Sequence, residues 1–268
     1  MSINLRPAAV AGMFYPDSAA VLAQDVFGLL SGAAQRPGLR PKAIIVPHAG
    51  YQYSGAVAAN GFAQIAALRD TIRRVVLLGP THRGAIDGLA LPSSTAFSTP
   101  LGDVPIDQHA VDLIKDLPQI VISDAAHAQE HSLEVQLPFL QIVLGEFSLL
   151  PLAVGRATPT QVADVLDPLW GGEETLIVIS TDLSHFLPYD KAQQMDAQAV
   201  QSILELSPTL LHQQACGATP VNGLLLAAQR HGLRAQLVDL CNSGDTAGDK
   251  VRVVGYGAFA FSEENSDA

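Results

Sequence analysis

Residues 176–186 read LIVISTDLSHF, a short apolar run that ends in a polar turn. Two other segments repeat this pattern, IIVPHAGYQYSG at 44–55 and VVLLGPTH at 75–82. Short apolar runs bounded by turn residues are typical of strands that are buried on both faces. Because such strands occur in parallel sheets covered by helices on both sides, the three segments predict an α/β fold.

The rest of the chain alternates between similar short runs and longer amphipathic stretches. The expected strands lie at 43–46, 75–78, 89–91, 149–154, 176–179, 236–240 and 251–261. Apolar residues at helical spacing predict helices at 56–68, 108–115, 132–144, 160–169, 189–206 and 221–231. Residues 97–107 interrupt the alternation, and the acidic end at 263–268 is expected to be frayed. The alternation predicts one domain, 1–268, with a largely parallel sheet.

The composition supports a large core. Hydrophobic residues make up 48% of the 268 residues and charged residues 15%, so the chain can bury enough apolar surface to stay folded. The mean hydropathy of +0.25 is high, but the apolar runs are far shorter than the roughly 20 residues of a membrane-spanning helix. We therefore expect no membrane span.

The net charge disfavours several partners. A formal charge of −11 without a Lys/Arg cluster repels phosphate backbones and anionic membranes, so we expect neither nucleic acid nor membrane as a partner. Residues 1–6 lack the basic stretch and apolar run of a secretory signal, which predicts a cytoplasmic protein. In that reducing compartment Cys216 and Cys241 are expected to be free thiols.

Four expected strands end, within a few residues, in side chains that bind metals or move protons. These side chains are His48, His82, the pair Asp182 and His185, and Cys241. A single histidine after a strand is more often a hydrogen-bonded loop residue, and a single buried cysteine is usually packing. In open α/β sheets, however, the loops beyond the carboxyl ends of neighbouring strands converge and bind ligands. The four together therefore predict one pocket.

The expected metal ligands are His48, His82 and Cys241. Two imidazoles and a thiolate leave coordination positions open, as catalytic metal sites do. These ligand types suit iron, zinc or copper and disfavour magnesium and calcium. The residues alone do not choose among the three metals.

Asp182 and His185 stand three residues apart in TDLSH. One interpretation makes His185 a catalytic acid/base beside the metal and has Asp182 fix its tautomer. The alternative has Asp182 cap a following helix, but it leaves His185 without a role. We prefer the first interpretation.

Residues 131–141, HSLEVQLPFLQ, place His131 and Glu134 on one face of an expected helix. His131 is a further catalytic candidate, and Glu134 is a candidate for lining the pocket. The equally weighted alternative is an ordinary helix start, which Ser132 caps and in which Glu134 favours the positive end of the helix dipole.

The remaining candidates are judged by their surroundings. Tyr51 and Tyr53 flank the turn after His48 and either form an aromatic wall for a substrate or pack in the core. Cys216 precedes an apolar helix and is expected to be buried packing, with contact to the pocket as the lesser alternative. Four other histidines are expected to be surface or structural residues: His109, His127, His212 and His231.

Seven motifs, in order, resemble those of the Memo family, whose prokaryotic members are called AmmeMemoRadiSam system protein B. They are AVAGMFYP (9–16), PHAGYQYSG (47–55), LGPTH (78–82), FSTPLGD (97–103), EHSLEVQLPFLQ (130–141), STDLSHF (180–186) and CNSGD (241–245). The match runs from about residue 6 to residue 261. Seven ordered motifs are far more specific than any one of them.

The resemblance implies a fold and a site. The family is similar to the class III extradiol dioxygenases of the LigB type, which implies a three-layer α/β/α sandwich with a non-haem Fe(II) pocket at the strand ends. It places metal ligands at His48, His82 and Cys241, with Asp182 and His185 nearby, and implies Fe(II) first, with copper or zinc as alternatives. Those dioxygenases carry a carboxylate where this chain has Cys241, so ring cleavage is not implied.

Three functions remain open at this point. The first is a metal-dependent oxidoreductase that acts on a small molecule or on dioxygen. The second is a non-catalytic metal- or ligand-binding protein, which the family's links to signalling in eukaryotes keep open. The third is a hydrolase, zinc-dependent or metal-free, with Cys241 as nucleophile and His185 as base.

Overall fold

The fold is built around a mixed sheet, which has nine strands within residues 4–36 and 38–263, the part of the chain that the computed structural model describes. Four central strands run parallel, in the order β2 (Ala43–Val46), β9 (Thr175–Ser180), β3 (Arg74–Pro80) and β8 (Ser148–Val154). Beyond them lie β4 (Leu89–Leu91), antiparallel to β8, and β7 (Ile120–Ile122), parallel to β4. The prediction of a largely parallel, mixed sheet is confirmed.

Antiparallel strands extend the sheet on the side of β2. The long strand β12 (Val253–Glu263) pairs with β2, with β10 (His185–Leu187) and with β11 (Leu233–Asn242). A separate small sheet contains β1 (Leu5–Arg6), β5 (Ala96–Thr99) and β6 (Gly102–Pro105). The interruption expected at 97–107 is therefore mainly a hairpin, which pairs with the start of the described chain.

Eight α-helices lie within the described residues. They are α1 (Ala19–Ser31), α2 (Tyr51–Ala63), α3 (Gln108–Ile114), α4 (Asp124–Ala128), α5 (Leu137–Leu144), α6 (Pro159–Leu169), α7 (Tyr189–Leu204) and α8 (Ala218–Arg230). Three short 3-10 turns accompany them: η1 (Ala66–Leu68), η2 (Glu134–Gln136) and η3 (Ser243–Asp245). No helix in this part of the chain is long and apolar enough to cross a membrane.

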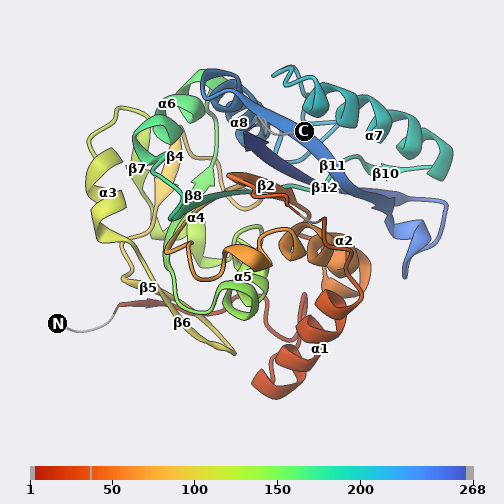
Figure 1. The fold of residues 1–268 in the computed structure, drawn as a ribbon, viewed down its shortest axis with the longest axis horizontal. Helices are drawn as coiled ribbons and strands as arrows, with labels where there is room; N and C mark the ends of the chain where they lie inside the picture. Colours follow the sequence, from red (N-terminus) through yellow and green to blue (C-terminus); the bar gives the residue numbers. More distant parts are fainter. Residues whose placement is uncertain (1–3, 37, 264–268) are drawn as a thin grey trace.

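Successive residues of the central strands point to opposite faces of the sheet and so build two cores. On β2, Ile45 belongs to the core that includes α3, α6, α7 and α8. Its neighbours Ile44 and Val46 belong to the core that includes α1, α2 and α5. Figure 1 shows α1, α2 and α5 on one side of the sheet and α6, α7 and α8 on the other. The architecture is a three-layer α/β/α sandwich, consistent with the resemblance to LigB-type dioxygenases.

Several predicted boundaries are wrong. The helix expected at 56–68 begins at Tyr51 and ends at Ala63, with η1 following. The helix expected from 132 is the turn η2 followed by α5. Helix α1 was not predicted. Its buried residues form an apolar face, but the exposed apolar residues Val21 and Phe27 lie off that face and obscure the helical spacing in the sequence. Of the tail expected at 263–268, Glu263 ends β12 and the rest lies outside the described residues.

Candidate metal site

Three imidazoles form one cluster at the carboxyl ends of the central strands. His48 follows β2 and His82 follows β3, while β9 pairs with both of these strands. One ligand atom from each of His48, His82 and His131 lies within 4.8 Å of the corresponding atoms of the other two. The sequence predicted the first two as metal ligands and His131 as a catalytic residue, but the structure places all three as equal members of one set.

His131 reaches the cluster because β3 has a glycine where the loop before η2 crosses it. A Cβ atom on Gly79 would lie 2.7 Å from Oγ of Ser132 and 3.1 Å from the side chain of Leu133. Only glycine allows this close approach without a shift of the loop. The Oγ of Ser132 donates to the carbonyl of Pro80 at 2.9 Å, which ties the loop to the end of β3. The alternative in which Ser132 caps a helix is therefore wrong.

The hydrogen bonds of Ser180 fix the tautomer of His48. The Ser180 hydroxyl donates to the carbonyl of Ser132 at 2.6 Å and accepts from Nε2 of Gln136 at 2.8 Å. Its single proton is thus already used, so Nδ1 of His48, 2.9 Å away, must be the donor. Nε2 of His48 then carries a lone pair, and this nitrogen is the atom that can bind a metal ion.

The carboxylate of Glu130 fixes His82 in the same way. Oε1 of Glu130 lies 2.9 Å from Nδ1 of His82 and 3.4 Å from Nδ1 of His131. Burial alone would raise the pKa of Glu130, but hydrogen bonds from His82 and Ser132 outweigh it and hold this pKa at about 2. An ionised carboxylate only accepts, so Nδ1 of His82 donates, and the tautomer of the neutral ring is the one with its lone pair on Nε2. A carboxylate behind a ligating histidine is a common arrangement in metal sites.

Two of the imidazoles, those of His48 and His131, are held in the neutral form that binds metals. Burial, with smaller contributions from His131, His82 and His185, places the pKa of His48 well below its usual value. Burial, followed by repulsion from His82, lowers the pKa of His131 to about 4. Since a metal ion competes with protons for the same lone pairs, low pKa values keep these lone pairs available at neutral pH.

Asp182 lies beside the cluster and contacts His48. Its Oδ1 accepts the backbone N–H of His48 at 2.7 Å, and its Oδ2 lies 4.0 Å from Nε2 of His48. Burial raises the pKa of Asp182 to about 6, although the hydrogen bond from His48 opposes this shift. No helix follows directly, since β10 begins at His185, so the helix-cap alternative for Asp182 is wrong.

His185 does not have the partner that was expected. Its Nδ1 donates a hydrogen bond to the carbonyl of Leu183 at 2.8 Å, which selects the tautomer with its proton on Nδ1 in the neutral ring. This carbonyl, and not Asp182, therefore sets the tautomer of His185. The residue lies near enough to His48 to lower its pKa, and its acid/base role stays a prediction.

The two cysteines occupy different surroundings. Cys241, on β11, packs with the apolar cluster of Val57, Tyr256 and Ala258, and it is not a member of any metal-type group among the described residues. Sγ of Cys216 lies 3.3 Å from Nε2 of His48. The lesser alternative for Cys216, contact with the pocket, is thus what the structure shows. The ligand role of Cys241 stays a prediction.

The predicted pocket-lining residues are mostly packed inside the protein. Glu134 is completely buried and binds Arg6, the hydroxyl of Tyr15 and backbone amides of the segment at 9–10. Tyr51 is also buried, and its hydroxyl donates to the carbonyl of Val135 at 2.7 Å. Tyr53 is half-buried beside the apolar cluster that contains Cys241. Glu134 and Tyr51 hold the loops around the site.

Three functional side chains escaped the sequence analysis: Glu130, Ser180 and Gln136. Glu130 directly precedes His131, and Ser180 ends the strand before Asp182. Their roles depend on contacts across the sheet, which no local pattern reveals. The only sequence signal was their place inside the motifs EHSLEVQLPFLQ and STDLSHF.

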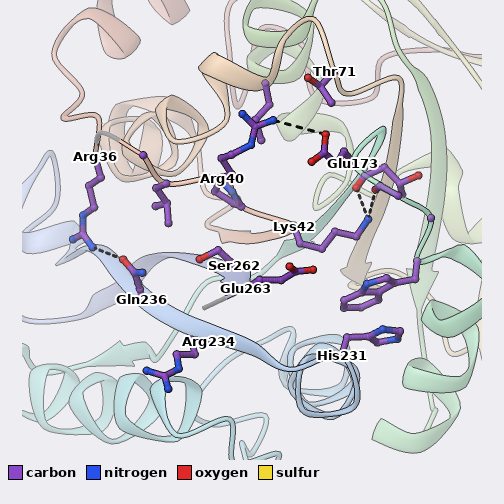
Figure 2. A pocket seen from close by; sticks show the side chains of 18 residues that line it. Arg36, Arg40, Lys42, Thr71, Glu173, His231, Arg234, Gln236, Ser262 and Glu263 are labelled. Carbon is purple, nitrogen blue, oxygen red and sulfur yellow. Dashed lines mark hydrogen bonds and ion pairs between the residues drawn. The ribbon is translucent and has the colours of Figure 1, made fainter. Parts of the chain in front are cut away.

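A cavity of about 790 Å³ opens beside the cluster, lined among others by His82, Cys216, Val154 and Thr219. A larger cavity of about 820 Å³ lies at the opposite edge, where strands β2, β3 and β9 begin. Figure 2 shows the partners of two of its cations: Lys42 donates to two carbonyls, and Arg40 pairs with Glu173. No metal-type group among the described residues lies in this second cavity.

Fold and site together define an α/β protein with three metal-type imidazoles at the carboxyl ends of a parallel sheet. The chain belongs to the Memo-like protein family, whose pattern it matches over residues 6–260. A MEMO1 family protein of Aquifex aeolicus (strain VF5) is 37% identical over 271 residues, covering 97% of this chain and all of that protein.

A MEMO1 family protein of Ignicoccus hospitalis is 35% identical over 283 residues, covering 96% of this chain and 98% of the relative. Among solved structures, the uncharacterized protein JW3007 from Escherichia coli K12 superposes with a TM-score of 0.49 at 13% identity, covering 81% of this chain and 99% of that chain. This last likeness carries no weight in the assignment.

Proposed function

We propose that this protein binds one redox-active metal ion between His48, His82 and His131 and acts as an oxidoreductase on a small molecule or on dioxygen. The observation that carries the proposal is a pair of hydrogen bonds, from Nδ1 of His48 to Ser180 and from Nδ1 of His82 to Glu130. In both rings they leave Nε2 as the nitrogen that can bind a metal, and ligand atoms of these rings and of His131 lie within 4.8 Å of one another. Rings oriented by a hydroxyl or a carboxylate behind Nδ1 are common among metal-binding histidines.

The protein's own groups would divide the work at this site. The three imidazoles would hold the ion, Glu130 and Ser180 would keep the rings in place, and His185 would move a proton near the pocket. The bound metal would supply electron transfer or Lewis acidity. Imidazoles suit iron, copper and zinc, so our preference for Fe(II), with copper second, rests on the Memo family's resemblance to LigB-type dioxygenases.

The cavity beside the cluster supports a small substrate. Its volume of about 790 Å³ is within the range of small-molecule pockets, and His82 lies on its wall. We also propose a cytoplasmic location and, from the formal net charge of −11, no nucleic-acid or membrane partner.

The hydrolase alternative finds little support in the geometry. Burial, followed by the charges of Asp239 and Asp245, raises the pKa of the Cys241 thiol to about 12, whereas a nucleophilic cysteine needs a lowered pKa. Among the described residues, no hydrogen bond joins Cys241 to His185.

Elemental analysis of protein purified without oxygen tests the proposal. We expect near-stoichiometric iron or copper in the wild type and strongly reduced metal in His48→Ala and His131→Ala. The Cys241→Ser variant shows whether this cysteine is a ligand, as the family resemblance implies. Oxygen consumption by the metal-loaded protein separates an oxidoreductase from a protein that binds metal without turnover. A wild type without any transition metal, which also takes up none on reconstitution, contradicts the proposal.

A further inference from the structure

The turn between α6 and β9 forms one wall of the 820 Å³ cavity, at the edge of the sheet opposite the imidazole cluster. Gly171 allows this turn, because its φ of +59° lies in the left-handed region that favours glycine. A Cβ atom on Gly171 would also lie 2.3 Å from Oγ1 of Thr175. Nζ of Lys42 donates to the carbonyls of Gly172 at 2.7 Å and of Thr175 at 2.8 Å. The turn thus holds one ammonium group in a fixed position at the cavity.

Four cations line this cavity, although the chain as a whole carries a net charge of −11. Figure 2 shows them around it: Arg36, Arg40 and Lys42 from the segment before β2, and Arg234 from β11. The described part of the lining also holds two carboxylates, Glu173 and Glu263. With His231 neutral, four cations and two carboxylates give a net charge of +2. Salt screens the acidic surface elsewhere beyond about 8 Å, so this cavity attracts small anions.

Three of the four charges are only weakly neutralised inside the protein. Arg36 donates to the carbonyl of Leu237 at 2.7 Å, and Lys42 forms no ion pair with any carboxylate that the structure describes. Carbonyls orient these cations without cancelling their charge. Arg40 and Glu173 lie 3.9 Å apart with side chains that are 61% and 81% exposed, so water and salt weaken their ion pair. An anion can therefore replace or join the present partners.

Lys42 in particular lacks a negative partner. An ammonium group has three N–H donors, and the described residues accept two of those of Lys42, which leaves the third for a ligand. Burial lowers the pKa of Lys42 to about 8, although the charges of Glu174 and Glu263 oppose this shift. A bound anion would favour the charged form and raise this pKa. The cavity thus holds a partly buried cation that an anion would stabilise.

Trp170 gives the cavity an apolar wall beside this cation. Its ring stacks on that of His231 with 3.8 Å between the ring centres, and Nζ of Lys42 lies 5.7 Å from the centre of the tryptophan ring. The buried side chain of Leu68 belongs to the same lining. A volume of about 820 Å³ far exceeds the space of an inorganic anion and falls within the range of small-molecule pockets. A ligand with its charge on Lys42 would therefore have its carbon skeleton beside Trp170.

We propose that this cavity binds a small organic phosphate, with the phosphate group on Arg40 and Lys42 and the carbon skeleton against Trp170. A phosphate monoester carries about −1.5 to −2 charges at neutral pH, which matches the lining, whereas a carboxylate carries only one. Arginine and lysine are both common phosphate-binding residues. The site lies away from the imidazole cluster and needs no metal, so the inference goes beyond the proposed function and does not rest on it.

The composition of the chain makes the test direct. Trp170 is the only tryptophan, so its fluorescence reports a ligand bound near this cavity. Lys42 is one of four lysines, and the other three, Lys115, Lys191 and Lys250, are absent from the lining. The probe is pyridoxal 5′-phosphate, which quenches tryptophan fluorescence. Its aldehyde forms an imine with a neighbouring lysine as water leaves, and borohydride reduces the imine to an amine that peptide mapping locates. Pyridoxal, the same molecule without phosphate, is the matched control.

We expect saturable quenching by pyridoxal 5′-phosphate, binding of pyridoxal that is at least about tenfold weaker, and the label on Lys42. Arg40→Gln should weaken the binding of pyridoxal 5′-phosphate about tenfold. The control Arg252→Gln should not change it, because Arg252 directly precedes β12, whereas the cavity lies at the far end of this strand, at Glu263. In Lys42→Gln we expect weaker binding and no label in this cavity.

Three results would overturn the proposal. The first is equal affinity for pyridoxal and pyridoxal 5′-phosphate, or a label spread evenly over the four lysines. The second is equal weakening in Arg40→Gln and Arg252→Gln, which would report only the overall charge. The third is inorganic phosphate that displaces the probe at the probe's own concentration, which would show a site for a simple anion. Should Lys42→Gln not fold, the labelled lysine of the wild type and the affinity of Arg40→Gln still decide.

Discussion

Glu130 holds His82 by two bonds at once: its Oε1 lies 2.9 Å from Nδ1 of the ring, and its Oε2 accepts the backbone N–H of the same residue at 2.6 Å. Oε1 also accepts the N–H of Ser132 at 2.8 Å and lies 3.4 Å from Nδ1 of His131. One buried carboxylate therefore fixes the ring and the backbone of His82, holds the backbone of Ser132 and lies beside the ring of His131.

Replacing Glu130 by Gln removes this charge while nearly keeping the shape of the side chain. A neutral amide polarises the imidazoles of His82 and His131 less than a carboxylate does, so they donate electrons to a metal less well. The amide also accepts fewer hydrogen bonds from the N–H groups around it. We expect metal affinity to fall by roughly 10- to 100-fold, as for other groups that support metal ligands. Competition with a chromophoric chelator measures this change. The exposed Glu146→Gln is the control, and an unchanged affinity in Glu130→Gln would show that the carboxylate does not support the site.

His131 and His185 make a pair that distinguishes ligand from acid/base roles. Only His131 belongs to the group of converging imidazoles, whereas His185 donates to the carbonyl of Leu183. We expect His131→Ala to bind metal at least about tenfold more weakly and His185→Ala to keep its metal. Metal content after dialysis against a weak chelator gives the comparison. Equal losses of metal in the two variants would contradict the role of His131 as a metal ligand that distinguishes it from His185.

Ser180→Ala tests the hydrogen bonds that set the tautomer of His48. The change leaves Nε2 of Gln136, the carbonyl of Ser132 and Nδ1 of His48 each without one buried partner. An unsatisfied buried polar group costs about 1–3 kcal/mol, so we expect the free energy of unfolding to drop by at least that amount, with weaker metal binding. Urea denaturation measures this free energy for Ser180→Ala and for the control Ser31→Ala, which removes only an exposed hydrogen bond from a hydroxyl to a carbonyl within α1. A stability loss no greater than that of Ser31→Ala would mean that water replaces the lost hydroxyl.

The sheet was predictable because its central strands are short apolar runs with turn residues at both ends. His48 and His82 followed from the same pattern, since each stands just beyond such a run. The position of His131 was not predictable, because it depends on a loop crossing Gly79 of a distant strand. A helical spacing in the sequence hid that loop, which the structure shows as an irregular segment before η2.

The cysteines show a second limit of the sequence. Cys241 follows an apolar run, as the two histidines do, but its strand β11 is separated from β2 by β12. The order of strands across a sheet is a tertiary property that local patterns do not contain. Cys216 has no strand before it and reaches His48 through the packing of α8, so its position had no comparable signal.

Glu134 is expected to matter for folding and not for substrate contact. It forms a buried ion pair with Arg6 and accepts a hydrogen bond from the hydroxyl of Tyr15. Removing one partner of a buried pair leaves an uncompensated charge and costs about 3–5 kcal/mol, so Glu134→Gln should strongly lower the unfolding free energy. Asp87→Asn, which breaks an exposed pair with Arg156, should have little effect. Equal denaturation midpoints for the two variants would contradict this assignment.

His127 gives the protein a defined sensitivity to acid. Burial, only partly offset by its hydrogen bond to the carbonyl of Ala90, lowers the pKa of His127 to about 4 from 6.5. Between these two values the unfolded chain binds the extra proton and the folded protein does not, so the unfolding free energy falls as the pH drops through this window. The loss attributable to His127 is on the order of 2–3 kcal/mol at pH 4.5, compared with pH 7.5. The glutamine of His127→Gln does not titrate, so between pH 7.5 and pH 4.5 the unfolding free energy of this variant, measured by urea denaturation, should fall less than that of the wild type by this amount. The exposed control His109→Gln should follow the wild type. Parallel pH profiles for wild type and His127→Gln would mean that the ring of His127 is not held neutral by the fold.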